Sequence, residues 1–238
     1  MLNKEVLQIL KDYNLGGAMR WLLDHSQSQG HPYHSLAHCV DVMHRVCTIW
    51  GWSAEGRVTL PKKPPKQLVY AALFHDANHS GGFFTDDAKN VDLASSAFSA
   101  YWFSDYCLKV FKRVEHDMLF EYDVSQLIMY TKYPFAELDH IGSMSLQNVE
   151  FCIDVLRDAD FMNRTEETLL NHLVGIKQEL FKYDSWKEYL DKTLAFYKTI
   201  KYRTEYGLKY GKPQLQRATD DVTQLYQLLY SSPTKAHE

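Results

Sequence analysis

The sequence predicts an all-α fold, a single compact domain of about ten helices. Apolar residues recur at helical spacing along most of the chain, and glycines and prolines interrupt them at short intervals. The segment 124–129 has strand propensity, but no partner strand of similar quality occurs elsewhere. We therefore expect helices packed around a common centre, without a sheet.

In the first half of the chain, helices are expected between breaks rich in glycine and proline. The apolar patterns predict helices over residues 4–13, 17–25, 35–50 and 66–76. Breaks fall at 16–17 and 30–32, and the composition of 51–65 predicts a loop. Because the run Leu68–Phe74 is apolar on nearly every side, we expect its helix to be buried.

In the second half, helices follow one another with short connections. We expect them over residues 87–103, 104–117, 122–132, 145–161, 165–182, 184–207 and 215–230. Asp86 or Asp87 is a suitable N-cap, and Pro134 ends one helix. The domain is predicted to span residues 1–230, followed by a loose tail over 231–238.

Composition limits the classes of protein to which the chain can belong. Its 238 residues are 45% hydrophobic, so a substantial core is expected. A net charge of −4 argues against binding to polymeric nucleic acid. The four cysteines show no metal-binding spacing, and no run suggests a membrane span or a signal core. We expect a cytoplasmic protein.

Two segments carry histidine pairs at helical spacing. His34 and His38 are four residues apart, as are His75 and His79, so each pair would lie on one helix face. Asp76 follows His75 at the end of the apolar run, where a buried carboxylate is costly unless it meets a cation or donors. Singly, each residue is consistent with capping or surface exposure. Together they favour a divalent metal site, since such ions take nitrogen and oxygen ligands from converging helices.

The motifs resemble those of the HD superfamily of metal-dependent phosphohydrolases, most closely cyclic nucleotide phosphodiesterase catalytic domains of bacterial or phage type. Residues 33–42 are similar to that family's Tyr-His-Asn-x-x-His-x-x-Asp-Val signature. Residues 71–81 are similar to its Ala-Ala-Leu-x-His-Asp-x-x-His-x-Gly signature, and 159–163 to its Ala-Asp-Leu-Ser-Asn segment. The order of the motifs agrees, and the resemblance spans roughly residues 30–165.

The resemblance implies a role for each matched residue. The ligands of a first metal would be His38, His75, Asp76 and Asp160. Asp76 would bridge to a second metal if one is present, so the expected cofactor is one or two divalent ions. Mn, Mg, Zn and Fe are not distinguished by such ligands. His34 would be the general acid that protonates the leaving oxygen, and His79 would organise a water near the metals.

Asp158 competes with Asp160 for the last ligand position. Two residues apart on a helix, the two side chains point in different directions, so only one can join the site. The Ala-Asp-apolar pattern favours Asp160. Asp158 would then pair with Arg157 or Arg164, or face solvent.

The resemblance implies hydrolysis of a phosphodiester of a small nucleotide, but leaves alternatives open. The first alternative is a phosphomonoesterase, or a (deoxy)nucleoside triphosphate or alarmone hydrolase, of the same fold. The second alternative is a non-catalytic nucleotide sensor. Ser35 and the pair Ala77-Asn78 depart from the family pattern. The candidates for a purine-binding glutamine are Gln214, Gln216 and Gln224, chosen only because they lie near the C-terminus. An aromatic-rich stretch over 183–210 could pack on the core, close the pocket or form the seam of a homodimer.

Overall fold

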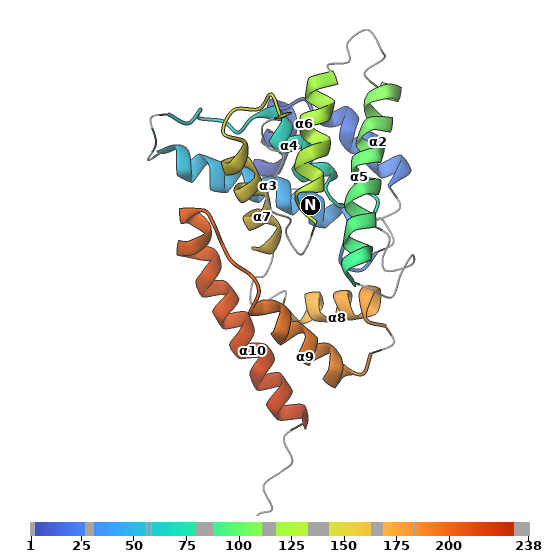
Figure 1. Cartoon of the computed structure of the whole chain (residues 1–238), viewed down its shortest axis with the longest axis vertical. Coiled ribbons are helices and arrows are strands. Elements are labelled where there is room, and N and C mark those ends of the chain that lie inside the picture. Colours follow the sequence, from blue (N-terminus) through green and yellow to red (C-terminus); the bar gives the residue numbers. More distant parts are fainter. Residues whose placement is uncertain are drawn as a thin grey trace, which may run out of the picture.

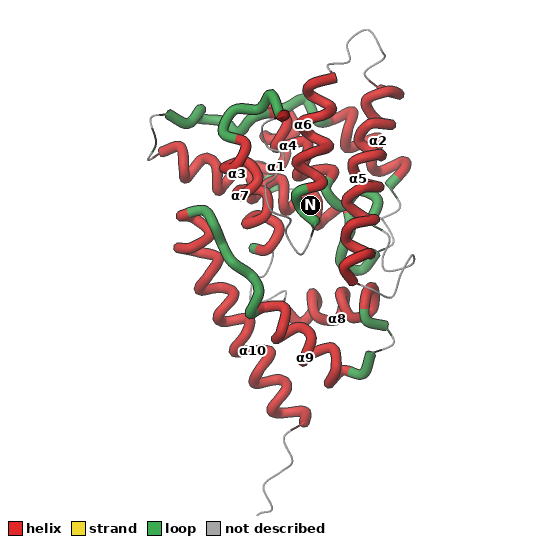
Figure 2. Tube along the Cα trace, viewed as in Figure 1, coloured by secondary structure: helices red, strands yellow, loops and turns green. Residues whose placement is uncertain are grey.

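The computed structural model confirms the all-α class. It describes residues 3–26, 31–55, 57, 59–79, 88–110, 118–132, 143–162, 169–182 and 184–230. Within these ranges every regular element is helical and none is a strand (Figure 2). The predicted C-terminal tail, 231–238, lies outside them.

Ten α-helices and one π-helical segment make up the described fold. They are α1 (Lys4–Asp12), α2 (Gly16–His25), α3 (Leu36–Glu55), α4 (Lys66–Phe74), α5 (Ala88–Val110), α6 (Met118–Met129), α7 (Val149–Phe161), α8 (Leu169–Leu180), α9 (Trp186–Tyr197), η4 (Gly207–Gly211) and α10 (Lys212–Tyr230). Helices α2 to α7 gather in one group, and α8, α9 and α10 lie along one end of it (Figure 1).

Helix α4 lies at the centre of the core and positions the residues that follow it. Every side chain from Leu68 to Phe74 is buried, as its apolar sequence predicts. The helix contacts α3, α5, α6 and α7. Phe74 packs against Phe103 and Tyr106 of α5, with ring centroids 5.1 and 5.3 Å apart. His75, the C-cap of α4, therefore emerges at the inner edge of a closely packed core.

Several helix boundaries differ from the predicted ones because tertiary contacts override local signals. Helix α3 continues past Gly51 to Glu55, where Ser53 is buried and the ring of Trp52 contacts that of Tyr206, with centroids 5.6 Å apart. Helix α5 runs unbroken through 103–104, since Phe103 and Cys107 extend one buried face. The predicted helix over 184–207 stops at Tyr197.

A buried carboxylate accepts hydrogen bonds from the segment between α9 and η4, where the predicted helix is interrupted. Asp158 of α7 accepts hydrogen bonds from the backbone N–H of Arg203 and Thr204 at 3.1 and 2.8 Å, and from the Thr204 hydroxyl at 2.7 Å. These bonds satisfy backbone groups that a continuous helix would have paired internally. Gly207 lies so close that an added Cβ would collide with the Asp158 carboxylate.

We predict that Gly207→Ala destabilises the protein, because the methyl group has no room beside Asp158. The free energy of unfolding should fall by about 1–3 kcal/mol, as in other overpacked sites. Gly51→Ala is the matched control, since nothing lies within 4 Å of its Cβ position inside α3. That change should stabilise by about 0.5–1 kcal/mol. Urea unfolding of both variants would test this, and equal effects would contradict the steric explanation.

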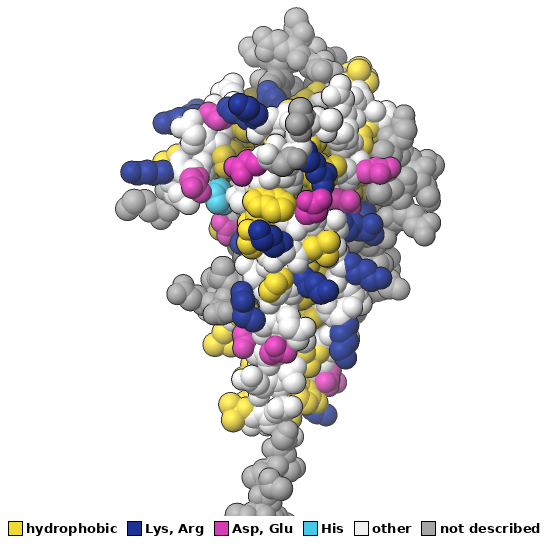
Figure 3. Space-filling model, turned by 90° about the vertical axis from the view of Figure 1, so that its left-hand side faces the viewer, with side chains coloured by type: hydrophobic (Ala, Val, Ile, Leu, Met, Phe, Trp, Pro, Cys, Tyr) yellow, Lys and Arg dark blue, Asp and Glu magenta, His cyan; other side chains and the backbone are white. Residues whose placement is uncertain are grey.

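Figure 3 shows basic and acidic side chains interspersed on the face it presents. This mixture agrees with the small net charge of −4. Among the described helices, none combines the length and apolar character that crossing a bilayer requires.

Candidate metal centre

Three helices bring four potential metal ligands together at the inner edge of the core. They are His38 of α3, His75 and Asp76 at the end of α4, and Asp160 of α7. The Nε2 atoms of His38 and His75 are 3.2 Å apart. His38 Nε2 lies 3.3 Å from Asp76 Oδ2 and 3.2 Å from Asp160 Oδ1. The structure thus brings together all four residues that the sequence suggested as ligands.

The spacing of these atoms suits a small divalent cation. His75 Nε2 is 3.2 Å from Asp76 Oδ2 and 3.6 Å from Asp160 Oδ1. Ligands bound about 2.0–2.1 Å from a tetrahedral ion lie about 3.3 Å from one another. The measured separations bracket that value. A divalent ion at their centre would be within bonding distance of all four donors.

The orientation of His75 also favours metal binding through Nε2. Its Nδ1 lies 2.8 Å from the carbonyl oxygen of Ala72. Because a carbonyl can only accept, Nδ1 carries the hydrogen, and the lone pair of the neutral ring is on Nε2. A carbonyl partner of this kind fixes the tautomer of histidines that bind metals.

Without a cation, the cluster holds its charges as histidine–carboxylate pairs. Burial lowers the pKa of His38, but hydrogen bonds to Asp160 and Asp76 outweigh it and raise the pKa above the usual value. Burial is likewise outweighed at His75, where Asp76 and Asp160 raise the pKa well above the usual range. Burial raises the pKa of both carboxyl groups, and the two histidines more than reverse that effect.

Metal binding near neutral pH should therefore release protons. A ligand imidazole must be neutral, whereas the raised pKa values of His38 and His75 favour protonated rings in the metal-free protein. Affinity should rise with pH until both rings are deprotonated. Calorimetric titration with Mn²⁺ in buffers of different ionisation enthalpy would count the protons released. An affinity independent of pH would contradict this prediction.

A second group of ionisable side chains surrounds Glu179 of α8. Glu179 is 6% exposed, and its Oε1 lies 2.7 Å from His34 Nδ1 and 3.2 Å from His79 Nδ1. His31 Nδ1 lies 3.5 Å from the same oxygen. Oε2 accepts hydrogen bonds from the backbone N–H of Tyr33 and His34, at 3.0 and 3.1 Å. Glu179 thereby fixes both the ring and the backbone of His34.

The geometry of this second group allows both histidines to hydrogen-bond to Glu179. The rings of His34 and His79 are stacked, with centroids 3.6 Å apart and planes inclined by 19°. The ligand atoms of His34, His79 and Glu179 lie within 4.8 Å of one another, so the group could also hold a metal ion. Both Nδ1 atoms lie close to the same oxygen of Glu179, so each ring can donate an N–H group to this carboxylate.

The electrostatics agree with that interpretation. Burial raises the pKa of Glu179, but His34 and His79 outweigh it, so the pKa lies well below the usual range. The pKa of His34 is lowered by burial and by His79, while Glu179 acts in the opposite direction. Glu179 thus stays ionised beside an imidazole that gives up a proton readily.

Glu179 was not identified from the sequence. It falls in a predicted helix without a motif, where a glutamate is usually an exposed charge. Its burial depends on the close approach of α8 to the segment before α3, where the Cβ position of Gly175 lies 3.2 Å from the Pro32 carbonyl. Glu179 is one turn beyond Gly175 and so faces the same segment.

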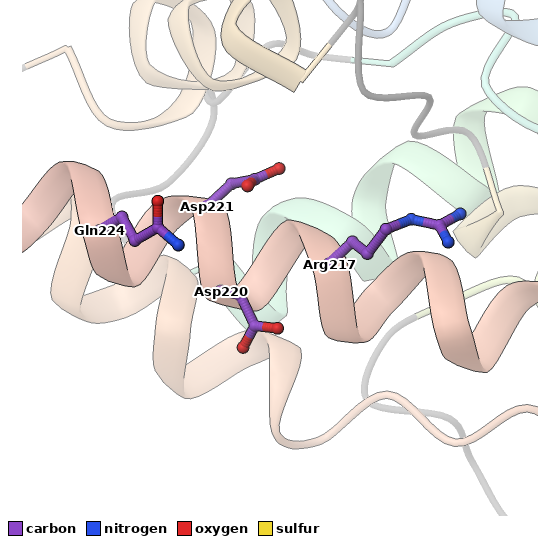
Figure 4. Close-up of a pocket in the computed structure, with 4 residues that line it drawn as sticks. All are labelled: Arg217, Asp220, Asp221 and Gln224. Atoms are coloured by element: carbon purple, nitrogen blue, oxygen red, sulfur yellow. The ribbon is translucent and has the colours of Figure 1, made fainter.

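Other predicted residues lie outside these clusters. Asp158 is buried and accepts hydrogen bonds from Arg203 and Thr204, so the expectation that it could face solvent was wrong, while Arg164, one of its two expected partners, lies outside the described residues. Gln224 borders an open hollow on α10 with Arg217, Asp220 and Asp221 (Figure 4). None of the ligand residues lines this hollow.

No family model, no curated protein and no solved structure matches this chain.

Proposed function

We propose that the protein is a metal-dependent phosphohydrolase that cleaves a phosphodiester of a small nucleotide. The observation that carries the proposal is the convergence of His38, His75, Asp76 and Asp160 within metal-binding distance of one another. A divalent ion held there would lower the pKa of a bound water and supply hydroxide near neutral pH. The half-buried His34 beside the cluster supports hydrolysis over metal storage, because it offers a proton donor.

In this proposal His34 protonates the leaving oxygen. Its Nδ1–H donates to Glu179, so Nε2 is the nitrogen that can face a substrate. A carboxylate that orients an imidazole through its far nitrogen is a recurring arrangement in general acid–base catalysis. The ring centroids of His34 and His38 are 6.1 Å apart, so His34 lies beside one of the four residues of the cluster.

The four ligand residues would hold and neutralise the metal, and Glu179 and His79 would keep His34 oriented. His79 bonds to the same carboxylate as His34, so we assign it a positioning role. Because the general acid must be protonated, the hydrolysis rate should fall as pH rises through the pKa of His34.

Product analysis on the metal-stripped and reconstituted protein would test the proposed function. Protein loaded with Mn²⁺, Mg²⁺, Zn²⁺ or Fe²⁺ would be offered 3′,5′- and 2′,3′-cyclic nucleotides, linear dinucleotides, and nucleoside 5′-mono- and triphosphates. We expect opening or cleavage of a diester, abolished in Asp76→Ala. Release of phosphate or triphosphate from linear mononucleotides alone would contradict the diester assignment. Tight nucleotide binding without turnover with every metal would contradict enzymatic activity.

A further inference from the structure

Arg45 lies on the face of α3 that carries the metal ligand His38. The two residues are seven positions apart, which is close to two helical turns or about 10 Å along the axis. Helical side chains lean toward the N-terminus, so the long arginine side chain extends from its Cα in the direction of His38.

One residue of the centre is among the groups that act on the charge of Arg45. Burial lowers the pKa of Arg45, and four neighbouring groups oppose the shift: Asp41, Tyr33, Tyr202 and Asp160. Asp160 is one of the four ligands. Tyr33 borders the centre on the other side, with its ring centroid 5.2 Å from that of His38. Arg45 is thus a cation whose charge interacts with a residue of the cluster and with tyrosines from two other segments.

One nitrogen of this guanidinium lacks a hydrogen-bond partner among the described residues. Its Nη1 is buried, and the described residues provide no hydrogen-bond acceptor for it. By contrast Arg157, a buried arginine of α7, donates from Nε to the Tyr130 carbonyl at 2.9 Å and holds the end of α6. Leaving a buried charged donor unsatisfied costs free energy, and such a group in a native protein calls for an explanation. An anionic ligand would supply the missing acceptor.

Charge counting indicates which anion fits. Two neutral imidazoles, two carboxylates and one divalent cation sum to zero, so such a centre alone has no net attraction for an anion. In the reactive state, in which the general acid His34 is protonated, its pair with ionised Glu179 also sums to zero. Arg45 adds one positive charge, which matches the single negative charge of a phosphodiester. Its planar fork of N–H donors is suited to phosphate oxygens.

We propose that Arg45 binds a non-bridging phosphate oxygen of the substrate and holds the phosphodiester against the metal centre. This rests on the proposed function for the identity of the substrate, but the anion site itself can be tested without turnover. Asp41, four residues before Arg45, is exposed and does not satisfy the buried Nη1.

Binding of inorganic phosphate to the Mn²⁺-loaded protein tests the proposal. We expect Arg45→Gln to raise the phosphate dissociation constant about 10–100-fold, the usual loss of a charge-assisted hydrogen bond. Arg45→Lys should give a smaller loss, because it keeps the charge without the fork. Arg20→Gln, at an exposed site on α2, removes the same charge and should change nothing. Wild-type affinity in Arg45→Gln would overturn the proposal.

A measurement on the wild-type protein avoids any folding defect of the variants. Phenylglyoxal labelling followed by peptide mass spectrometry would report the reactivity of each arginine with and without phosphate. We expect phosphate to slow modification of Arg45 but not of Arg20. Equal protection, or none, would overturn the assignment. If phosphate binds through Arg45 yet no phosphoester is cleaved, the proposed function fails while the anion site stands. If Arg45→Gln leaves the rate of phosphodiester hydrolysis unchanged, the proposed role of Arg45 fails while the proposed function stands.

Discussion

Asp76→Ala should reduce diester hydrolysis to background and weaken metal binding by more than about 100-fold. Asp76 Oδ2 lies within 3.3 Å of the Nε2 atoms of both His38 and His75, so its removal takes away one ligand and half of the negative charge of the cluster. The two imidazoles then also lose the anion that holds their pKa values up. Competition with a chelating dye measures the metal affinity, and steady-state kinetics at saturating metal measures the activity.

Asp191→Ala provides the control for this prediction. Asp191 is an exposed carboxylate on α9, so the change removes the same charge without touching the cluster. Its metal affinity and activity should equal those of the wild type. Retention of metal by Asp76→Ala would contradict the assignment of Asp76 as a ligand.

His34→Ala should show an effect that depends on the leaving group. A nucleotide diester releases an alkoxide, which requires a proton, so its turnover should fall about 10²–10⁴-fold. A p-nitrophenyl diester releases a stable phenolate that departs without protonation, and its turnover should change by less than about tenfold. Steady-state kinetics on both substrates, with metal content measured in parallel, checks the prediction.

Equal losses for the two substrates would contradict general acid catalysis by His34. They would instead indicate that the substitution disturbs the metal centre, which His34 adjoins but does not join. Metal content separates these cases, because a disturbed centre would also lose its ion. Glu179 would remain buried in this variant with His79 as a hydrogen-bond partner.

The fold class was predictable from strong local patterns, and the convergence of His38, His75, Asp76 and Asp160 from histidine spacing together with the motif resemblance. The apolar run Leu68–Phe74 has only one stable location, the centre of the core, and His75 and Asp76 follow it directly. The boundaries of α3, α5 and α9 were less predictable. They depend on long-range contacts, such as the bonds from Thr204 to Asp158, which leave no local signal.

Glu179 and Arg45 could not be predicted for the same reason. Both belong to residue types that are mostly exposed, and nothing in the neighbouring sequence distinguishes them from solvated charges. Glu179 becomes buried because α8 packs against the segment before α3. Arg45 becomes important because Asp160, far away in the sequence, comes close enough to act on it electrostatically.

Metal analysis of two variants, with substitutions two residues apart on α7, tests the central claim most directly. Asp160→Asn and Asp158→Asn each neutralise a carboxylate of α7, but only Asp160 belongs to the cluster. After equilibration with Mn²⁺ or Zn²⁺ and gel filtration, mass spectrometry of the metal would give its ratio to folded protein. We expect the wild type and Asp158→Asn to retain metal and Asp160→Asn to lose it. A wild type without tightly bound metal, or an Asp160→Asn variant that keeps it, would contradict the assignment of this site.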